Sequence, residues 1–183
     1  MLENKLGITD SAELARIEEK ISKQKAVEMF ESGYLESLEA GTFESLAKIH
    51  KYLFDEIYDF AGEVRKVNIS KGNFRFAPLI YLDAALQSID KMPQSTFDEI
   101  VEKYVEMNVA HPFRDGNGRV GRLIMFKECL KYNIVPFIIE DNLKMFYYRG
   151  LKEWNNEKGY LTDTCLTAQD KYKAYLDYFR IVY

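Results

Sequence analysis

The sequence predicts an all-α domain of about seven helices that carries one small β-hairpin. Apolar residues recur at i, i+3, i+4 spacing through most of the 183 residues, which is typical of helices that bury one face. The period changes only between Glu63 and Pro78, where two short β-like runs surround the sequence Ser70-Lys71-Gly72-Asn73. A chain of this length can bury one sizeable core, so we expect a single domain over residues 1–183.

Each expected helix carries a start or stop signal. Capping Ser, Thr or Asp residues, glycine stops and a proline at a first turn divide the chain into helices at approximately 11–32, 42–61, 78–89, 96–110, 118–130, 142–154 and 162–180. The clearest start is at 96–110, because Thr96 and Glu99 have the spacing of a capping box. We expect a turn at 36–41 and a buried connection around Pro136, which argues against a regular central strand.

The composition disfavours several classes of protein. The formal net charge is −4 and no basic block stands out, which argues against direct nucleic-acid binding. No apolar run approaches the roughly 20 residues of a membrane span. Charged residues within the first five positions also lead us to expect no signal peptide. Because Cys129 and Cys165 fall in helical segments, we expect them to be reduced core thiols of a cytoplasmic protein.

The twelve residues from His111 to Arg122 concentrate the reactive chemistry of the chain. They include an imidazole that can take a proton from a hydroxyl and a carboxylate, Asp115, that can hold Mg²⁺. Glycines allow backbone N–H groups to approach an anion, and arginines grip phosphate oxygens in a bidentate fork. The stretch therefore indicates a polyphosphate site.

Two other interpretations of this stretch fit less well. Its glycines match the dinucleotide fingerprint G-x-G-x-x-G, but that fingerprint requires a preceding strand, and here a helix precedes it. An ordinary turn between two helices would not need His, Asp, Asn and Arg together. A glycine-rich turn that leads into a helix N-terminus is an anion site on any fold.

Three features outside the stretch His111–Arg122 can each be interpreted in two ways. His50 is either a second acid–base group or a packed core histidine with one satisfied nitrogen, and the absence of a phosphate-binding neighbour in the sequence favours the core. The basic hairpin is either a solvated surface element or a lid whose edge pairs with an extended peptide. Aromatic residues of the following helix either stack on a base or pack in the core, and the core is the commoner place for them: Tyr147, Tyr148 and Trp154.

The nine residues His111–Arg119 match, at every position, the motif His-Pro-Phe-x-[Asp/Glu]-Gly-Asn-[Gly/Lys]-Arg of the Fic family. The chain resembles this family from about Ser11 to its C-terminal helix. Arg122 corresponds to the second arginine usual in the family, and the hairpin lies where the family has its target-binding flap. The resemblance implies an all-helical Fic fold around a central motif helix, with a core at about 40–160, a flap at about 64–77 and a C-terminal helix at about 162–180.

The resemblance also implies an activity, which is Mg²⁺-dependent transfer of AMP from ATP to a Ser, Thr or Tyr hydroxyl of a target protein, with release of pyrophosphate. His111 would deprotonate that hydroxyl, Asp115 would bind Mg²⁺, and Phe113 would anchor the loop in the core. Five residues would hold phosphate oxygens: Gly116, Asn117, Gly118, Arg119 and Arg122. In the flap we expect two further nucleotide contacts, Lys71 and Gly72.

Two further expectations follow from the resemblance. Gly118 stands where the Doc-like kinase branch has lysine, which favours AMP transfer over phosphate transfer. The inhibitory motif [Ser/Thr]-x-x-x-Glu-[Gly/Asn] of many Fic enzymes is missing, so we expect Arg119 and Arg122 to meet ATP without obstruction by their own chain. A separate antitoxin-like protein would then supply inhibition, and bacterial cytosolic proteins would be the targets. The alternatives are a non-catalytic module that binds nucleotide or protein, and the transfer of another phosphate-containing group.

Overall fold

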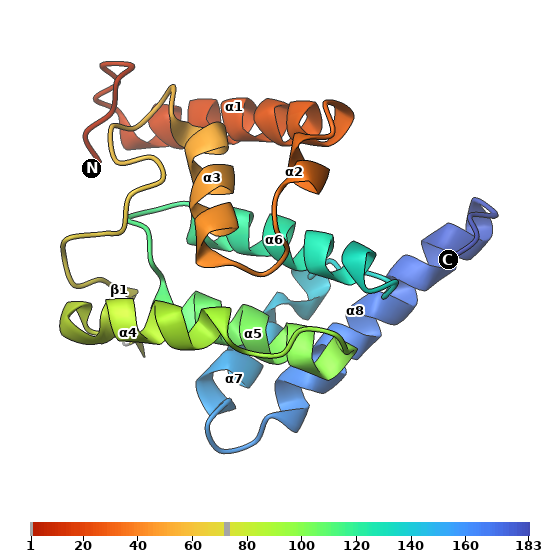
Figure 1. Cartoon of the computed structure of the whole chain (residues 1–183). Coiled ribbons are helices and arrows are strands. Elements are labelled where there is room, and N and C mark those ends of the chain that lie inside the picture. Colours follow the sequence, from red (N-terminus) through yellow and green to blue (C-terminus); the bar gives the residue numbers. More distant parts are fainter. Residues whose placement is uncertain (1, 72–73) are drawn as a thin grey trace.

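The structure, a computed structural model, describes residues 2–71 and 74–183. Within these ranges the chain forms eight α-helices, one 3₁₀-helix and a two-stranded antiparallel hairpin, which confirms the predicted all-α class (Figure 1). The elements are α1 (Ser11–Glu31), α2 (Tyr34–Ser37), α3 (Phe43–Phe54), β1 (Ser70–Lys71), β2 (Phe74–Arg75), α4 (Leu79–Asp90), α5 (Phe97–Ala110), α6 (Asn117–Lys131), η1 (Asp141–Leu143), α7 (Lys144–Glu153) and α8 (Gly159–Tyr178).

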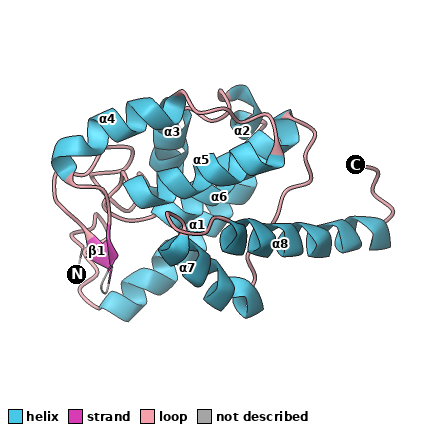
Figure 2. Cartoon of the chain, turned by 90° about the horizontal axis from the view of Figure 1, so that it is seen from below, coloured by secondary structure: helices cyan, strands magenta, loops and turns pink. Residues whose placement is uncertain are grey.

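Helix α6, which begins within the motif, lies at the centre of the fold (Figure 1). It packs against α5 and α3, while α1 packs on α3 and α4 packs on α5. One cluster of buried side chains joins α1, α3 and α4 to the first half of α6. A second cluster joins α5, α7 and α8 to its second half. Figure 2 shows α8 reaching beyond the rest of the chain at its C-terminal end.

The helix boundaries differ from the sequence prediction in three places. Helix α3 ends at Phe54, although the apolar period continues to Ala61. The period persists because Ile57 and Tyr58, which follow the helix, are buried in the same core as the helix. The expected turn at 36–41 begins instead with the last residues of the short helix α2. Helix α8 starts at Gly159, a few residues before the predicted 162.

Cys129 and Cys165 are buried and unpaired in the second cluster, as predicted for core thiols. Burial raises the pKa of each thiol to about 12, so both are poor nucleophiles near neutral pH. Among the described residues, no helix combines the length and the apolar character needed to cross the membrane.

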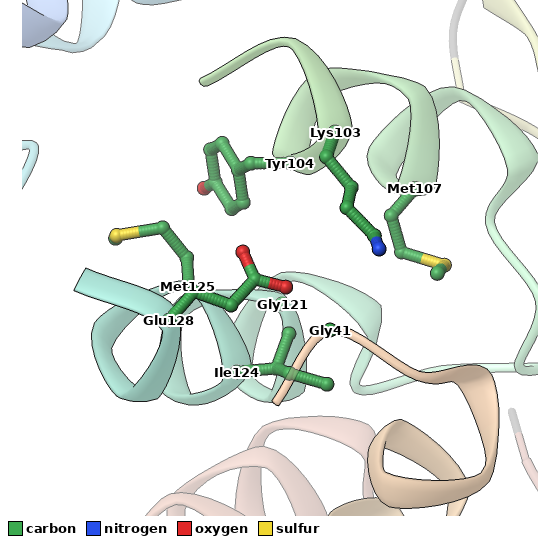
Figure 3. A pocket seen from close by; sticks show the side chains of 8 residues that line it. All are labelled: Gly41, Lys103, Tyr104, Met107, Gly121, Ile124, Met125 and Glu128. Atoms are coloured by element: carbon green, nitrogen blue, oxygen red, sulfur yellow. The ribbon is translucent and has the colours of Figure 1, made fainter. Parts of the chain in front are cut away.

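Helices α5 and α6 bury a lysine and a glutamate that line the same cavity. Figure 3 shows Lys103 and Glu128 at a cavity of about 10 Å³. The Lys103 ammonium donates to Gln94 Oε1 at 2.8 Å. Burial raises the pKa of Glu128 to about 7, although the nearby Lys103 charge acts in the opposite direction. Glu128 therefore ionises in the folded protein only at a free-energy cost.

We expect Glu128→Gln to stabilise the protein at pH 8 and to have little effect at pH 5. The folded pKa of about 7 lies above the ordinary 4.5, so the wild type loses stability as the pH rises from about 4.5 to about 7. The gain in the free energy of unfolding at pH 8 should be about 1–3 kcal/mol, measured by urea unfolding. Asp98→Asn, at an exposed carboxylate of α5, is the control. An equal gain at both pH values would contradict the assignment.

Candidate active site

The site begins at His111, where α5 ends. His111 adopts a left-handed backbone conformation, with φ 50° and ψ 62°, and its N–H donates to the carbonyl of Met107 at 3.0 Å. The motif therefore begins at a helix end, as the following Pro112 predicted. A left-handed residue with a side chain costs roughly 1–2 kcal/mol, so contacts elsewhere must hold this turn in place.

The His111 ring lies between the end of α5 and the flap. Its Nδ1 lies 3.3 Å from the carbonyl oxygen of Asn108, and its ring stacks on Phe76 with 3.6 Å between centroids. A carbonyl oxygen only accepts hydrogen bonds, so this contact favours the tautomer with the proton on Nδ1. Nε2 is then the basic nitrogen, which suits the acceptance of a hydroxyl proton.

The loop after His111 is closed by the side chain of Asn117. The N–H of Phe113 donates to Asn117 Oδ1, and Asn117 Nδ2 donates back to the Phe113 carbonyl, each at 2.8 Å. Phe113 is fully buried and stacks on His50, so it anchors the loop in the core as expected. The Asn117 amide, expected at a phosphate oxygen, is thus occupied by the loop itself. Asn117 would therefore bind an anion through its backbone N–H.

The first turn of α6 provides backbone donors for an anion. Gly116 precedes the helix in a left-handed conformation with φ 75°, and it offers no side-chain cap. A helix start leaves its first N–H groups without intrahelical acceptors, which here are those of Asn117 and Gly118. The Gly116 N–H donates instead to Asp115 Oδ1 at 2.6 Å. The partial positive charge of the helix start also favours a phosphate.

Asp115 is an exposed carboxylate beside this helix start. In the part of the chain that the structure describes, no group of three or more His, Cys, Asp or Glu side chains is arranged to hold a metal. Magnesium usually keeps several waters and is held by one or two carboxylates together with substrate phosphates. A lone exposed carboxylate next to an anion site therefore fits a Mg²⁺ ion that arrives with a nucleotide.

The Arg119 side chain is hydrogen-bonded to two side chains of α1. Its Nη2 donates to Glu18 Oε1 of α1, and its Nη1 donates to Ser22 Oγ at 3.2 Å. Its guanidinium lies 4.7 Å from the centroid of the Phe54 ring. Arg119 is therefore paired within its own chain, and the expectation that both arginines meet ATP without obstruction stays a prediction. The inhibitory motif was sought by sequence pattern, and Glu18 stands in no such pattern.

The Glu18 carboxylate is held from both sides. Its second oxygen accepts a hydrogen bond from the Tyr58 hydroxyl, which is buried. Burial and this hydrogen bond raise the pKa of Tyr58 well above its ordinary value, so its hydroxyl stays protonated and donates. Arg122, in contrast, is exposed. The two arginines therefore differ in how free they are to move toward a ligand.

His50 is a core histidine that also supports the loop. Its Nε2 lies 3.0 Å from the Asp115 carbonyl, and its Nδ1 accepts from the Gly62 N–H at 2.8 Å. Burial lowers the pKa of His50 to about 4, so the ring is neutral near pH 7. The core interpretation is correct, with both nitrogens satisfied where one was expected. A neutral ring engaged at both nitrogens does not serve as a second acid–base group.

The flap is only partly described. Lys71 lies in β1, opposite Phe74 of β2, but its side chain is outside the described part, and Gly72 lies outside the described residues altogether. Their predicted nucleotide contacts therefore stay predictions. Lys66 is exposed, whereas Arg65 is buried, so the hairpin is not a uniformly solvated basic element.

The aromatic candidates of α7 and its C-terminal end separate into two groups. Tyr147 is buried and its hydroxyl donates to the hydroxyl of Tyr104. Trp154 is buried and donates to Glu106. Tyr147 and Trp154 therefore pack in the core, which was the favoured interpretation of the sequence. Tyr148 is exposed.

Comparison with known proteins relates the chain to one family. A family model described as the Fic/DOC family matches residues 41–129. The protein adenylyltransferase VbhT of Bartonella schoenbuchensis is 33% identical over 130 residues, which cover 65% of this chain and 27% of that protein. The probable protein adenylyltransferase Fic of Salmonella typhimurium is 28% identical over 134 residues, which cover 67% of this chain and 64% of that protein. The chain thus spans less than two thirds of the length of these two curated relatives.

Solved structures share the fold. The BepC protein of Bartonella tribocorum, with bound AMPPNP, superposes with a TM-score of 0.72 at 20% identity, over 92% of this chain and 91% of that chain. The FIC domain of Bep5 from Bartonella clarridgeiae gives a TM-score of 0.73 at 15% identity, over 98% and 93% of the two chains. The predicted Fic fold is therefore confirmed.

We expect Gly116→Ala to destabilise the protein and Gly118→Ala to leave its stability nearly unchanged. A Cβ at Gly116 would lie 2.5 Å from the Phe54 ring at a φ of +75°, whereas one at Gly118 would meet nothing closer than 3.5 Å. Strain and overlap should cost about 2–4 kcal/mol at Gly116 and under about 1 kcal/mol at Gly118, by urea unfolding. Equal losses in the matched pair would contradict this view of the loop.

His50 should make the protein sensitive to acid. Its folded pKa of about 4 lies below the ordinary 6.5, so the unfolded state binds the proton first and stability falls as the pH drops from 6.5 toward 4. We expect His50→Gln to remove about 2 kcal/mol of the wild-type loss between pH 7 and pH 4.5, followed by urea unfolding. Parallel pH profiles for the two proteins would refute the neutral state of His50.

Proposed function

Because the chain belongs to the Fic/DOC family, we propose that it is a protein adenylyltransferase that moves AMP from ATP to a Ser, Thr or Tyr hydroxyl of a target protein. The complete motif His111–Arg119, folded with a histidine at a flap and a glycine-rich helix start beside it, carries this proposal. The names of the curated relatives, which are adenylyltransferases or probable ones, support it.

In the proposed reaction, a target hydroxyl loses its proton to His111 Nε2 as its oxygen attacks the α-phosphorus of ATP. The bond from the α-phosphorus to the oxygen that bridges to the β-phosphate breaks, and pyrophosphate leaves with the electron pair. The first N–H groups of α6 hold phosphate oxygens, while Arg119 and Arg122 neutralise the leaving group. This set is chemically sufficient because phosphoryl-type transfer depends mainly on positioning and charge neutralisation.

Magnesium would be held by Asp115 together with the nucleotide. When bound, the ion would neutralise charge on the α- and β-phosphates. Asp115 itself is positioned from two sides, because its carboxylate accepts from the Gly116 N–H and its carbonyl lies at the His50 ring. The flap residues Lys71 and Gly72 complete the proposed nucleotide site.

The target protein would bind at the flap. Within the described residues the hairpin pairs two residues on each side, and an extended peptide segment of the target would pair along one of its edges. Two free, buried cysteines are consistent with a reducing cytoplasm, where bacterial cytosolic proteins would be the substrates. Since the chain lacks the [Ser/Thr]-x-x-x-Glu-[Gly/Asn] motif, a separate antitoxin-like protein remains our proposal for its control.

His111→Ala should abolish transfer while ATP still binds. With α-³²P-ATP, Mg²⁺ and a bacterial lysate, the labelling of protein should fall by about 10²–10⁴-fold or more, because the general base is removed. Calorimetry should show ATP affinity within about threefold of the wild type, since His111 contacts the hydroxyl and not the phosphates.

Three outcomes would contradict the proposal. Equal labelling by wild type and variant would exclude His111 as the base. Label transferred from the γ-position would indicate phosphate transfer. Binding of ATP by the wild type without any transfer would favour a non-catalytic module.

A further inference from the structure

Arg65, at the base of the flap, is a buried cation whose acceptors among the described residues are all backbone carbonyls. It is 3% exposed. Its Nε donates to His111 at 2.8 Å, and its Nη1 donates to Val67 at 2.6 Å. Its Nη2 donates to Ala77 at 2.5 Å and to Ala110 at 3.3 Å. One side chain therefore joins three segments, which are the start of the flap, its end and the last turn of α5.

Backbone hydrogen bonds join the same segments. The Arg65 N–H donates to the Pro112 carbonyl at 2.8 Å, and the Ala77 N–H donates to the Val109 carbonyl at 3.1 Å. Both ends of the flap are thus attached to residues 109–112. The Arg65 guanidinium lies between these backbone hydrogen bonds and donates to four other carbonyls of the same segments.

This position requires an arginine. A guanidinium has five N–H donors in one rigid plane, whereas a lysine ammonium has three donors around a single atom. Four carbonyls from three segments can be reached together only by the planar group. Burial of an unpaired cation is costly unless its donors are satisfied, and the carbonyl end of α5 carries the partial negative charge that suits a cation.

We infer that Arg65 is a positioning residue that holds the flap and His111 in one fixed relation. It binds the carbonyl of His111, whose left-handed conformation needs support, and the carbonyl of Ala77, whose neighbour Phe76 stacks on the His111 ring. A hydroxyl presented along the flap then meets Nε2 at a constant distance. The catalytic consequence rests on the proposed adenylyl transfer, whereas the anchoring does not.

The test compares Arg65→Lys with Lys66→Ala. Lys66 is the neighbouring basic residue, with an 85% exposed side chain paired only to Glu63 in the described residues, and it serves as the matched control. Arg65→Lys keeps the charge and loses the planar fork. We expect kcat/KM for the protein target to fall by about 10–100-fold, mainly in kcat, because the reacting groups are misplaced. ATP affinity by calorimetry should stay within about threefold for Arg65→Lys, and Lys66→Ala should bind ATP within about twofold of wild type.

Hydrogen exchange provides a readout that does not need the activity. The Ala77 amide, which donates to Val109, should exchange at least about tenfold faster in Arg65→Lys and at the wild-type rate in Lys66→Ala. Unchanged exchange together with unchanged transfer would overturn the inference. Faster exchange with wild-type kcat would reduce Arg65 to a structural role and overturn the positioning claim. A wild type that transfers no AMP would refute the proposed function, and the exchange rates alone would then decide whether Arg65 anchors the flap.

Discussion

The reciprocal hydrogen bonds between the Asn117 side chain and the Phe113 backbone are the interaction on which the site depends. They close the loop into a tight ring and satisfy two polar groups of a residue that is fully buried. Left unsatisfied, each group would cost roughly 1–3 kcal/mol. This closed loop leads into α6 through a left-handed N-cap, Gly116, which provides no side-chain cap for the first N–H groups of the helix.

Three polar side chains from distant elements hold this loop and its helix from outside. His50 of α3 binds the Asp115 carbonyl, Arg65 of the flap base binds the His111 carbonyl, and Glu18 of α1 binds the Arg119 guanidinium. Each is buried and each has its polar atoms engaged, which is what a low-dielectric interior demands. Apolar packing thus places the helices, and buried hydrogen bonds determine the conformation of the loop that joins α5 to α6.

The sequence could predict what depends on local signals. Caps such as Thr96, the apolar period and the nine-residue motif placed the helices and the loop, and His50 was correctly assigned to the core. The roles of Glu18 and Arg65 could not be predicted, because a charged residue in a polar stretch looks solvated. Their partners lie 101 and 46 residues away along the chain. The end of α3 was missed because buried turn residues imitate a helical period.

The contact between Glu18 and Arg119 bears on where this domain starts as a folding unit. The family match begins at residue 41, yet α1 lies before it. A chain shortened to the match would keep every residue of the motif and lose the Glu18 carboxylate that binds the Arg119 guanidinium. It would also leave the buried Tyr58 hydroxyl without its acceptor. The boundary of the family match is therefore not a boundary of cooperative structure, because α1 supplies buried polar partners to residues inside the match.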